Sequence, residues 1–415
     1  MTRPTVHIIG AGLSGLAAAV ALSDGAWNLV VHEGARQAGG RCRSYHDASL
    51  DMMIDNGNHL LLSGNNAARA YCRRLGSEDH LVGPDEASFP FVDLATGASW
   101  TVRPNAGRIP WWIFRPDRRV PGTKALDYLA LARLMTAGKT ATIGSRMVCS
   151  GPLYRALWQP LLLAALNTDP PESSAALAAA IIKETLAKGG DACRPLIAAD
   201  GLGAAFVDPA LRYLAAKGAT LRFDHPLRRL TLSGGAVEAL EFADETIALG
   251  PDDRVILAVP ASTAAALVPG LSAPTAFRSI VNAHFKMAPP ASLQPILGVI
   301  GGTVEWIFAF PDRVSITISG ADRLLDVPRE TLVATLWDDI QRATGIADPL
   351  PPWQIIREKR ATFAATPEED AKRPATRAAL ANLVLAGDWT ATGLPATIEG
   401  SIRSGNTAAA ALAAG

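Results

Sequence analysis

The chain has 415 residues, which is enough for two or three domains. Hydrophobic residues make up 49% of it and charged residues 19%, so a disordered chain is excluded. Lys and Arg together number 39, as do Asp and Glu, and this balance gives no global field that would attract nucleic acid. The four cysteines show neither CxxC spacing nor a histidine at ligand spacing, which argues against a disulfide framework or a metal site.

Residues 5–33 are predicted to form one βαβ unit. Thr5–Ile9 is a short apolar strand, the turn of residues 10–15 (GAGLSG) follows, Leu16–Leu22 begins an alanine-rich helix, and Asn28–His32 is a second apolar strand. The stretch is almost free of charge and could pass for a signal-peptide core, but its three glycines fit a dinucleotide fold better. The apolar runs elsewhere fall short of the ~20 residues of a membrane span.

The GxGxxG spacing of this turn predicts a pyrophosphate site, because each glycine has a separate role. Gly10 makes the tight turn, Gly12 lets the backbone approach the phosphates, and Gly15 lets the helix pack closely on the strand. The phosphates would lie on free N–H groups at the helix N-terminus, those of Leu13 and Ser14. The alternative is a glycine-rich turn that binds no ligand.

The residues after the second strand favour FAD over NAD. Glu33 ends that strand and would accept hydrogen bonds from ribose hydroxyls. Gly39, Gly40 and Arg41 follow with the spacing E-x5-G-G-R, which resembles the second fingerprint of the flavoprotein group that contains amine oxidases, phytoene desaturases and protoporphyrinogen oxidases. In that group the paired glycines allow close approach of the flavin nucleotide, and the arginine lies near its phosphates. The alternative is an ordinary basic loop.

Three later segments are expected to return to the same nucleotide domain. Leu196–Gly203, a helix and Gly218–Arg222 look like a βαβ-type return, and Arg254–Pro260 is an apolar strand. A strand around Pro226–Leu230 would lie by the adenine, where the resemblance implies a backbone contact at Leu227.

The C-terminal segment supplies the flavin end of the predicted site. Leu383–Ala386 reads as a buried strand that ends in Gly387 and Asp388, and a terminal helix follows. The resemblance implies that the aspartate binds the ribityl chain. It also implies that the helix N-terminus around Thr397, Ile398 and Ser401 faces the N1/C2=O edge of the flavin, where its dipole would stabilise reduced flavin.

These segments predict an α/β protein with a discontinuous Rossmann-like FAD-binding domain and an α+β substrate domain of the amine oxidase and phytoene desaturase type. The FAD-binding domain would comprise residues 1–65, 195–265 and 375–415, and the substrate domain residues 66–194 and 266–374.

Longer strings make the resemblance more specific. They are Asp55–Asn65 (DNGNHLLLSGN), Phe89–Asp93 (FPFVD), Arg108–Trp112 (RIPWW), Leu157–Leu161 (LWQPL), Leu166–Thr168 (LNT) and Trp389–Ser401 (WTATGLPATIEGS). Together they are similar to the hydroxysqualene dehydroxylase family of bacterial squalene and hopanoid biosynthesis. The resemblance implies that hydride from reduced FAD replaces the allylic hydroxyl of a C30 isoprenoid alcohol, hydroxysqualene. The electron donor is not identified, and a separate reductase or small carrier is expected, because no second dinucleotide motif is visible.

Three residues are candidates for protonating the leaving hydroxyl. The resemblance places the Asp55–His59 stretch along the flavin ring, so Gly57, Asn58 and His59 would contact the cofactor. His59 would be either an acid or a hydrogen-bonded neighbour of the flavin. Asp55 would either stabilise its loop or take part in the chemistry. Glu399 would be either a favourable charge at a helix N-terminus or a buried acid with a raised pKa.

Residues 108–119 combine tryptophan with arginine, which is typical of a membrane interface. We expect the protein to be cytoplasmic and peripherally bound to the inner face of the cytoplasmic membrane, with this stretch at the mouth of the substrate tunnel. The alternative is that its aromatic residues are core and its arginines solvate the rim.

Two other functions fit parts of the sequence. An oxidative flavoenzyme, either an isoprenoid desaturase or an amine oxidase, would use the same scaffold with oxygen or a quinone as acceptor. A non-catalytic isoprenoid carrier that resembles the GDP-dissociation inhibitors would not need FAD, and the intact E-x5-G-G-R and Gly387-Asp388 motifs argue against it.

Overall fold

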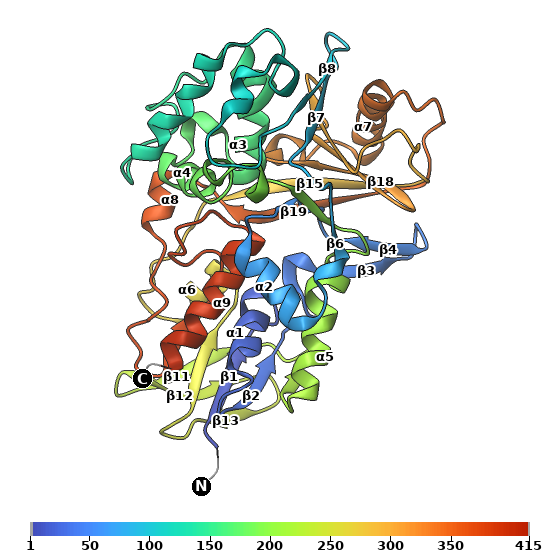
Figure 1. Ribbon diagram of the computed structural model, residues 1–415. Helices are drawn as coiled ribbons and strands as arrows, with labels where there is room; N and C mark the ends of the chain where they lie inside the picture. The colour runs from blue at the N-terminus through green and yellow to red at the C-terminus, as the bar shows by residue number, and fades with distance from the viewer. Residues whose placement is uncertain (1–2, 414–415) are drawn as a thin grey trace.

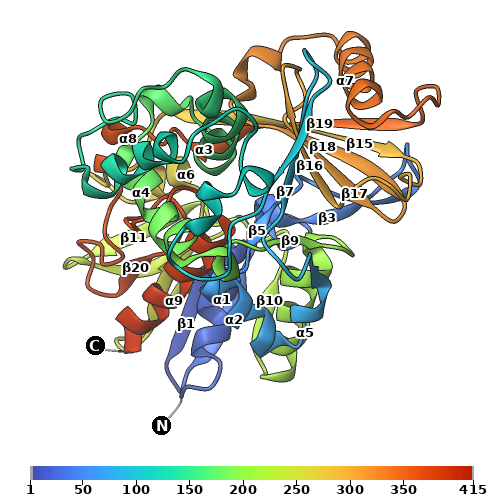
Figure 2. The ribbon, with the colours of Figure 1, turned by 45° about the horizontal axis from the view of Figure 1, so that its top comes forward.

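A computed structural model describes residues 3–413, so residues 1, 2, 414 and 415 of the predicted FAD-binding domain lie outside the described residues. Figure 1 shows three regions: a parallel sheet with its helices at the bottom, a large mixed sheet above it, and a helical part at the upper left. Figure 2 shows the same arrangement from another angle, with the helical part beside the large sheet.

The parallel sheet, called the nucleotide sheet below, has five strands in the order β10-β2-β1-β14-β20. Its strands are β1 (Thr5–Ile9), β2 (Asn28–His32), β10 (Thr220–Arg222), β14 (Arg254–Leu257) and β20 (Leu383–Leu385). Every neighbouring pair is parallel. Its most apolar strands are continuous hydrophobic runs, as expected for a sheet covered on both faces.

Helices α1 (Leu13–Leu22) and α9 (Ile398–Ala413) pack against each other in this region, beside α5 (Asp208–Ala216). Nine of the ten α1 residues are buried, and most of them are small or aliphatic. A Cβ on Gly405 of α9 would lie 2.3 Å from the backbone oxygen of Ser14, so glycine allows the two helices to approach closely. The first and last segments of the chain therefore form one structural unit.

Two expected strands are placed differently from the prediction. The strand in 196–203 is β9 (Pro195–Ala198), which pairs antiparallel with β5 (Leu61–Leu62) and β6 (Leu81–Val82) in a small separate sheet. The expected strand at 226–230 begins only at Arg229, as β11 (Arg229–Ser233), and Pro226 itself cannot donate to a ladder. Strand β11 pairs with β12 (Ala236–Glu241), which pairs with β13 (Thr246–Ala248).

The large sheet has seven strands in the order β19-β15-β18-β17-β16-β7-β8. They are β7 (Phe89–Asp93), β8 (Ser99–Val102), β15 (Phe277–Lys286), β16 (Ile296–Ile300), β17 (Trp306–Phe310), β18 (Arg313–Ile318) and β19 (Trp353–Phe363). Of the neighbouring strand pairs in this sheet, only β16 and β7 are parallel, and the others are antiparallel. The sheet thus joins strands from both parts of the predicted substrate domain. Helix α7 (Arg329–Thr344) packs on one face.

The helical part, residues 111–188, contains α3 (Gln159–Leu166), α4 (Ala175–Glu184) and a series of 3-10 turns, including Trp111–Phe114 and Ala125–Thr136. A one-turn π-helix at Tyr154–Trp158 runs directly into α3. Helix α2 (Asn66–Leu75) packs against α9, so it lies with the nucleotide sheet although the prediction begins the substrate domain at residue 66. The remaining strands and α-helices are β3 (Ser44–Asp47), β4 (Met52–Asp55), α6 (Ala261–Leu267) and α8 (Pro367–Ala371). Within residues 3–413, no helix combines the length and the apolar character needed to cross a membrane.

Candidate FAD site

The three glycines of the first turn are required for different reasons. Gly10 has φ +107°, and a Cβ there would lie 2.5 Å from the oxygen of Ala258. A Cβ on Gly15 would lie 1.9 Å from the oxygen of Gly10, so both positions are fixed by the protein backbone itself. A Cβ on Gly12, in contrast, would meet nothing within 4 Å, and its φ of −71° suits any residue. The turn therefore leaves open space at the position where the motif predicts the pyrophosphate.

Glu33 lies beside this turn at the end of β2. One carboxylate oxygen accepts a hydrogen bond from the N–H of Ala11 at 2.7 Å, and the other accepts one from Ala35 at 2.9 Å. A carboxylate has about four acceptor positions, so these two bonds orient the group and leave capacity for further donors. This arrangement suits the predicted contact with ribose hydroxyls.

The E-x5-G-G-R loop packs directly on the glycine turn. The N–H of Gly39 donates to the oxygen of Ala11 at 2.8 Å, and Gly39 and Gly40 have φ of +101° and +55°, which glycine adopts without strain. A Cβ on Gly40 would lie 3.5 Å from the Cα of Gly12. The two glycine motifs therefore line one concave stretch of backbone.

Arg41 and Asp388 meet although 347 residues separate them in the sequence. The guanidinium donates to the carboxylate at 2.7 Å, and the Asp388 side chain is 6% exposed. The neighbouring carboxylate raises the pKa of Arg41 above its ordinary value. The side chains predicted to lie near the phosphates and at the ribityl chain are thus joined by one ion pair, in which Arg41 keeps further donors and Asp388 further acceptor positions.

The loop around Leu227 is held against Glu33. His225 N–H donates to the oxygen of Glu33 at 2.9 Å, and Asp224 N–H donates to the oxygen of Ala35 at 3.0 Å. Across the described residues, the backbone N–H and C=O of Leu227 form no hydrogen bond with other protein groups. This position therefore has both a backbone donor and a backbone acceptor for an adenine edge.

The start of α9 has the geometry that the prediction needs. The Thr397 hydroxyl accepts a hydrogen bond from Gly400 N–H at 3.0 Å, and Ser401 N–H donates to the Thr397 oxygen at 2.9 Å, so Thr397 caps the helix. Gly387 is fixed to the same helix, because its N–H donates to the Ser404 hydroxyl at 2.8 Å. The strand end, Asp388 and the helix N-terminus are therefore one rigid corner.

Glu399 is occupied by protein contacts. Its carboxylate accepts hydrogen bonds from the N–H groups of Ala67 and Ala68 in the first turn of α2, at 3.0 and 2.9 Å, and pairs with Arg403 at 2.7 Å. The negative charge lies at the positive end of the α2 dipole. These contacts favour a structural role for Glu399 over that of a proton donor.

Asp55 is likewise engaged. Its carboxylate accepts hydrogen bonds from the Ser44 hydroxyl at 2.5 Å and the Leu202 N–H at 2.9 Å, and Arg313 lies 3.8 Å away. Burial raises the pKa of this carboxyl above its ordinary value. The residue connects β4 to the 201–203 loop and to the large sheet.

Asn58 and His59 retain unused polar groups. The Asn58 side-chain nitrogen donates to the oxygen of Ile316 at 3.1 Å, but its side-chain oxygen is buried without a partner. The half-buried imidazole of His59 forms no hydrogen bond with any residue in the described range 3–413. Burial, together with the positive charge of Arg41, lowers the pKa of His59 to about 4, so the ring is neutral at pH 7. Among the three candidate acids, His59 alone has a side chain that forms no hydrogen bond with the protein in the described range.

A polar stripe on the large sheet faces this segment and was not predicted from the sequence. Asn282 accepts a hydrogen bond from Asn58 N–H at 3.2 Å and another from the Thr317 hydroxyl at 2.7 Å. His284 bonds to the Ser315 hydroxyl at 2.8 Å and to the oxygen of Asp55 at 3.0 Å. These four side chains alternate with apolar residues on β15 and β18, and that alternation was a detectable signal.

These residues fit FAD. Open space at Gly12, the free backbone groups of Leu227 and the unpaired oxygen of Asn58 each offer what a dinucleotide needs. FAD would be held by the two glycine motifs, Glu33, the Arg41–Asp388 pair and the α9 N-terminus, and it would supply hydride chemistry at its flavin ring.

Comparison with known proteins agrees with this geometry. Residues 13–413 match the model of the flavin containing amine oxidoreductase family. A hydroxysqualene dehydroxylase from Sinorhizobium fredii is 57% identical over 97% of both chains, and one from Rhodopseudomonas palustris is 57% identical over 98% of this chain and 97% of its own. Among solved structures, cyclohexylamine oxidase from Brevibacterium oxydans superposes with a TM-score of 0.71 at 18% identity over 99% of both chains, which shows the shared fold. The chain is thus an FAD-dependent oxidoreductase that belongs to the hydroxysqualene dehydroxylase family within the flavin containing amine oxidoreductases.

Proposed function

We propose that this enzyme converts hydroxysqualene to squalene, as a step of bacterial squalene and hopanoid biosynthesis. The carbon–oxygen bond of the allylic alcohol breaks, the hydroxyl group takes up a proton and leaves as water, and a hydride forms the new carbon–hydrogen bond. Reduced FAD would supply that hydride. The observation that carries the proposal is 57% identity to hydroxysqualene dehydroxylases along nearly the whole chain.

We assign FAD binding to the residues of the predicted site. They are Gly10, Gly12, Leu13, Ser14, Gly15, Glu33, Gly39, Gly40, Arg41, Gly57, Asn58, His59, Leu227, Gly387, Asp388, Thr397, Ile398 and Ser401. The contacts described above support the assignment for the two glycine motifs, Glu33, the Arg41–Asp388 pair and the cap of α9.

For the reacting hydroxyl we assign His59 as the hydrogen-bonding partner. A neutral imidazole still has one N–H donor, and the absence of a protein partner in the described chain leaves that donor for a ligand. Asp55 and Glu399, the other two candidates, each accept two hydrogen bonds that stabilise loops or helices. The proton would therefore reach the hydroxyl through its hydrogen bond with His59 and not from either carboxylate.

The test is anaerobic. The purified holoenzyme is reduced chemically, hydroxysqualene is added, and the oxidised-flavin absorption band is followed while the lipid is extracted. Return of the band with an equal amount of squalene is the expected result. A flavin that stays reduced, with hydroxysqualene recovered, would overturn the proposal in favour of an oxidative desaturase or amine oxidase. Protein that binds no FAD when the cofactor is added would favour the carrier.

We also propose that the protein takes its isoprenoid substrate from a membrane through residues 108–148. Six of the eleven exposed large hydrophobic side chains in the described chain lie there: Ile109, Trp111, Phe114, Leu126, Leu129 and Val148, of which Ile109 is 78% exposed. We call these six the apolar surface. Trp112 and Ile113 are buried, so the aromatic stretch is partly core and partly surface.

Charge and a nearby cavity support a lipid partner. Arg118 stacks over the ring of Trp111 at 5.2 Å, and Arg108 and Arg115 lie in the same stretch, a combination suited to anionic headgroups. An open pocket of about 480 Å³ has Cys149, the residue after the exposed Val148, in its lining, together with Tyr154 and the polar residues Arg155 and Asp169.

Liposome sedimentation tests the membrane proposal. Trp111→Ser combined with Phe114→Ser should reduce binding to vesicles containing anionic lipid by about tenfold or more, since two exposed apolar side chains are lost. The matched control is Val82→Ser with Leu232→Ser, which removes two exposed apolar side chains elsewhere and should leave sedimentation unchanged. Equal sedimentation of the wild type and the first variant would rule this surface out.

A further inference from the structure

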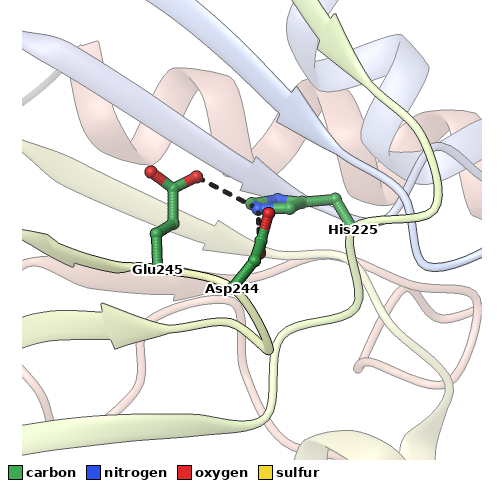
Figure 3. A group of neighbouring side chains, drawn as sticks. All are labelled: His225, Asp244 and Glu245. Atoms are coloured by element: carbon green, nitrogen blue, oxygen red, sulfur yellow. Dashed lines mark ion pairs between the residues drawn. The ribbon is translucent and has the colours of Figure 1, made fainter.

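We propose that His225, Asp244 and Glu245 form a binding site for a divalent metal ion of the zinc class, next to the loop that carries Leu227 of the FAD site. The three side chains point toward one another in Figure 3. The Nε2 atom of His225 lies 3.4 Å from a carboxylate oxygen of Asp244 and 3.2 Å from one of Glu245. One imidazole and two carboxylates are donors that Zn²⁺ accepts.

The separations match a shared ion better than a hydrogen bond. Around a tetrahedral zinc with bonds of about 2.1 Å, donor atoms lie about 3.4 Å apart, close to both observed distances. A ring N–H needs its acceptor near the N–H axis. Neither oxygen meets that requirement, and His225 Nε2 is therefore buried without a hydrogen-bond partner. Oxygens to the side of this axis are expected when a metal ion occupies the axis itself.

The surroundings of His225 direct this nitrogen toward the two carboxylates. The side chain is 6% exposed, its ring stacks on Phe242 with ring centroids 3.8 Å apart, and its Nδ1 lies 3.0 Å from Nδ1 of His32. The other nitrogen of the His32 ring, Nε2, lies 3.1 Å from Nδ1 of His7. This chain occupies Nδ1 and fixes the ring, and metal-binding histidines usually have such a partner on the other nitrogen. Only Nε2 is left for a ligand.

The two acids come from one tight turn. Phe242 N–H donates to the oxygen of Glu245 at 2.9 Å, so the β12–β13 connection brings Asp244 and Glu245 to the same side. Their side chains are 69% and 37% exposed, which gives an ion a path from solvent and room for water as a fourth ligand. The site could not be predicted from the sequence, because the histidine and the acids are 19 and 20 residues apart and lie in two different connections, β10–β11 and β12–β13.

Arg222 opposes the ion, because its guanidinium pairs with the same Glu245 oxygen. The ion and the guanidinium would compete for this oxygen. Removal of the arginine charge should therefore tighten metal binding, whereas removal of a true ligand should weaken it. The opposite signs of these two effects make the proposal testable without any activity assay.

The experiment uses the FAD-loaded enzyme, freed of metal by a chelator and then titrated with Zn²⁺. We expect one zinc per chain, and Co²⁺ in the same site should give the visible absorption of a tetrahedral complex. His225→Gln and Asp244→Asn should each weaken zinc binding by about 100-fold or more. Replacing even a residue that only supports a metal ligand lowers metal affinity by 10- to about 100-fold. Arg222→Gln should strengthen it. Asp244 is exposed, so its variant should fold normally.

A matched control distinguishes the site from chance binding. His80 also lies beside an acid, Asp200, at 2.7 Å, but without a second carboxylate. His80→Gln should leave zinc binding unchanged. If wild-type protein binds no stoichiometric zinc, or if His225→Gln and Asp244→Asn bind it as tightly as wild type, the three side chains form no metal site and the proposal is wrong.

Discussion

Gly12 and Gly15 belong to the same turn but need to be glycine for different reasons. At Gly15 any side chain would meet the backbone of Gly10, whereas at Gly12 the protein leaves open space. A motif search treats the two positions alike. The structure separates Gly15, which the fold requires, from Gly12, where the fold itself would tolerate a side chain.

Alanine at each position should therefore have a different effect. Gly15→Ala should lower the free energy of unfolding by about 3 kcal/mol or more, because its Cβ would overlap backbone that cannot yield. Gly12→Ala should keep stability within about 1 kcal/mol of wild type yet weaken FAD binding by about tenfold or more. Urea unfolding and FAD titration of the apoprotein measure these effects. Gly138→Ala, where a Cβ also meets nothing, is the control for both; normal FAD affinity in Gly12→Ala would contradict the assigned phosphate position.

At the scale of elements, the N-terminus of α2 and the first turn of α9 are joined by one buried carboxylate. Glu399, on α9, accepts hydrogen bonds from two N–H groups of α2, and Arg403 connects the same carboxylate to Glu184 of α4. Three helices from distant parts of the sequence thus depend on one side chain. Helix ends have unpaired N–H groups, so such a contact stabilises the junction.

Glu399→Gln tests whether this residue is structural or chemical. The loss of the charge should reduce stability by about 1–3 kcal/mol, because charge-assisted hydrogen bonds to a buried helix end are weakened. The turnover rate with hydroxysqualene at a temperature where both proteins are folded should stay within about threefold of wild type. Glu184→Gln, which affects only the Arg403 pair, should show a smaller loss of Tm. A large loss of turnover with unchanged Tm would instead restore Glu399 as the proton donor.

At the scale of the whole molecule, the nucleotide-binding segments and the large sheet meet through buried polar side chains. His284 of the large sheet bonds to the backbone oxygen of Asp55, and Asn282 bonds to Asn58. Burial lowers the pKa of His284 from 6.5 to about 3. The junction therefore depends on a neutral histidine.

Stability should consequently fall in acid. Between pH 6.5 and about 3 the unfolded chain binds a proton at His284 that the folded chain does not, so the contribution is complete above pH 6.5 and decreases as the pH falls. Each such histidine adds a slope of up to about 1.4 kcal/mol per pH unit. Urea unfolding from pH 7 to 4.5, with FAD in constant excess, should show a smaller slope for His284→Gln than for wild type. His46→Gln, an exposed histidine, should retain the wild-type slope, and equal slopes in all three proteins would contradict the prediction.

The local part of this protein could be read from its sequence. Strands β1 and β2 lie at the predicted residues, and the strands at 254–257 and 383–385 joined them as expected. The cofactor and the family were also predicted correctly. Backbone sterics explain this success, because a glycine turn between a strand and a helix is specified by residues that are neighbours in the chain.

The partners of distant segments were decided only by the tertiary structure. The apolar character of Pro195–Ala198 indicates a strand but not which sheet it joins, and β9 pairs with β5 and β6. The environments of Asp55 and Glu399 could not be predicted either, since Leu202 and Ala67, which donate hydrogen bonds to them, are more than 140 positions away in the sequence. The same holds for the His225 cluster. A side chain's pKa and its free donor or acceptor atoms depend on what burial and long-range packing place beside it, and sequence spacing does not contain that information.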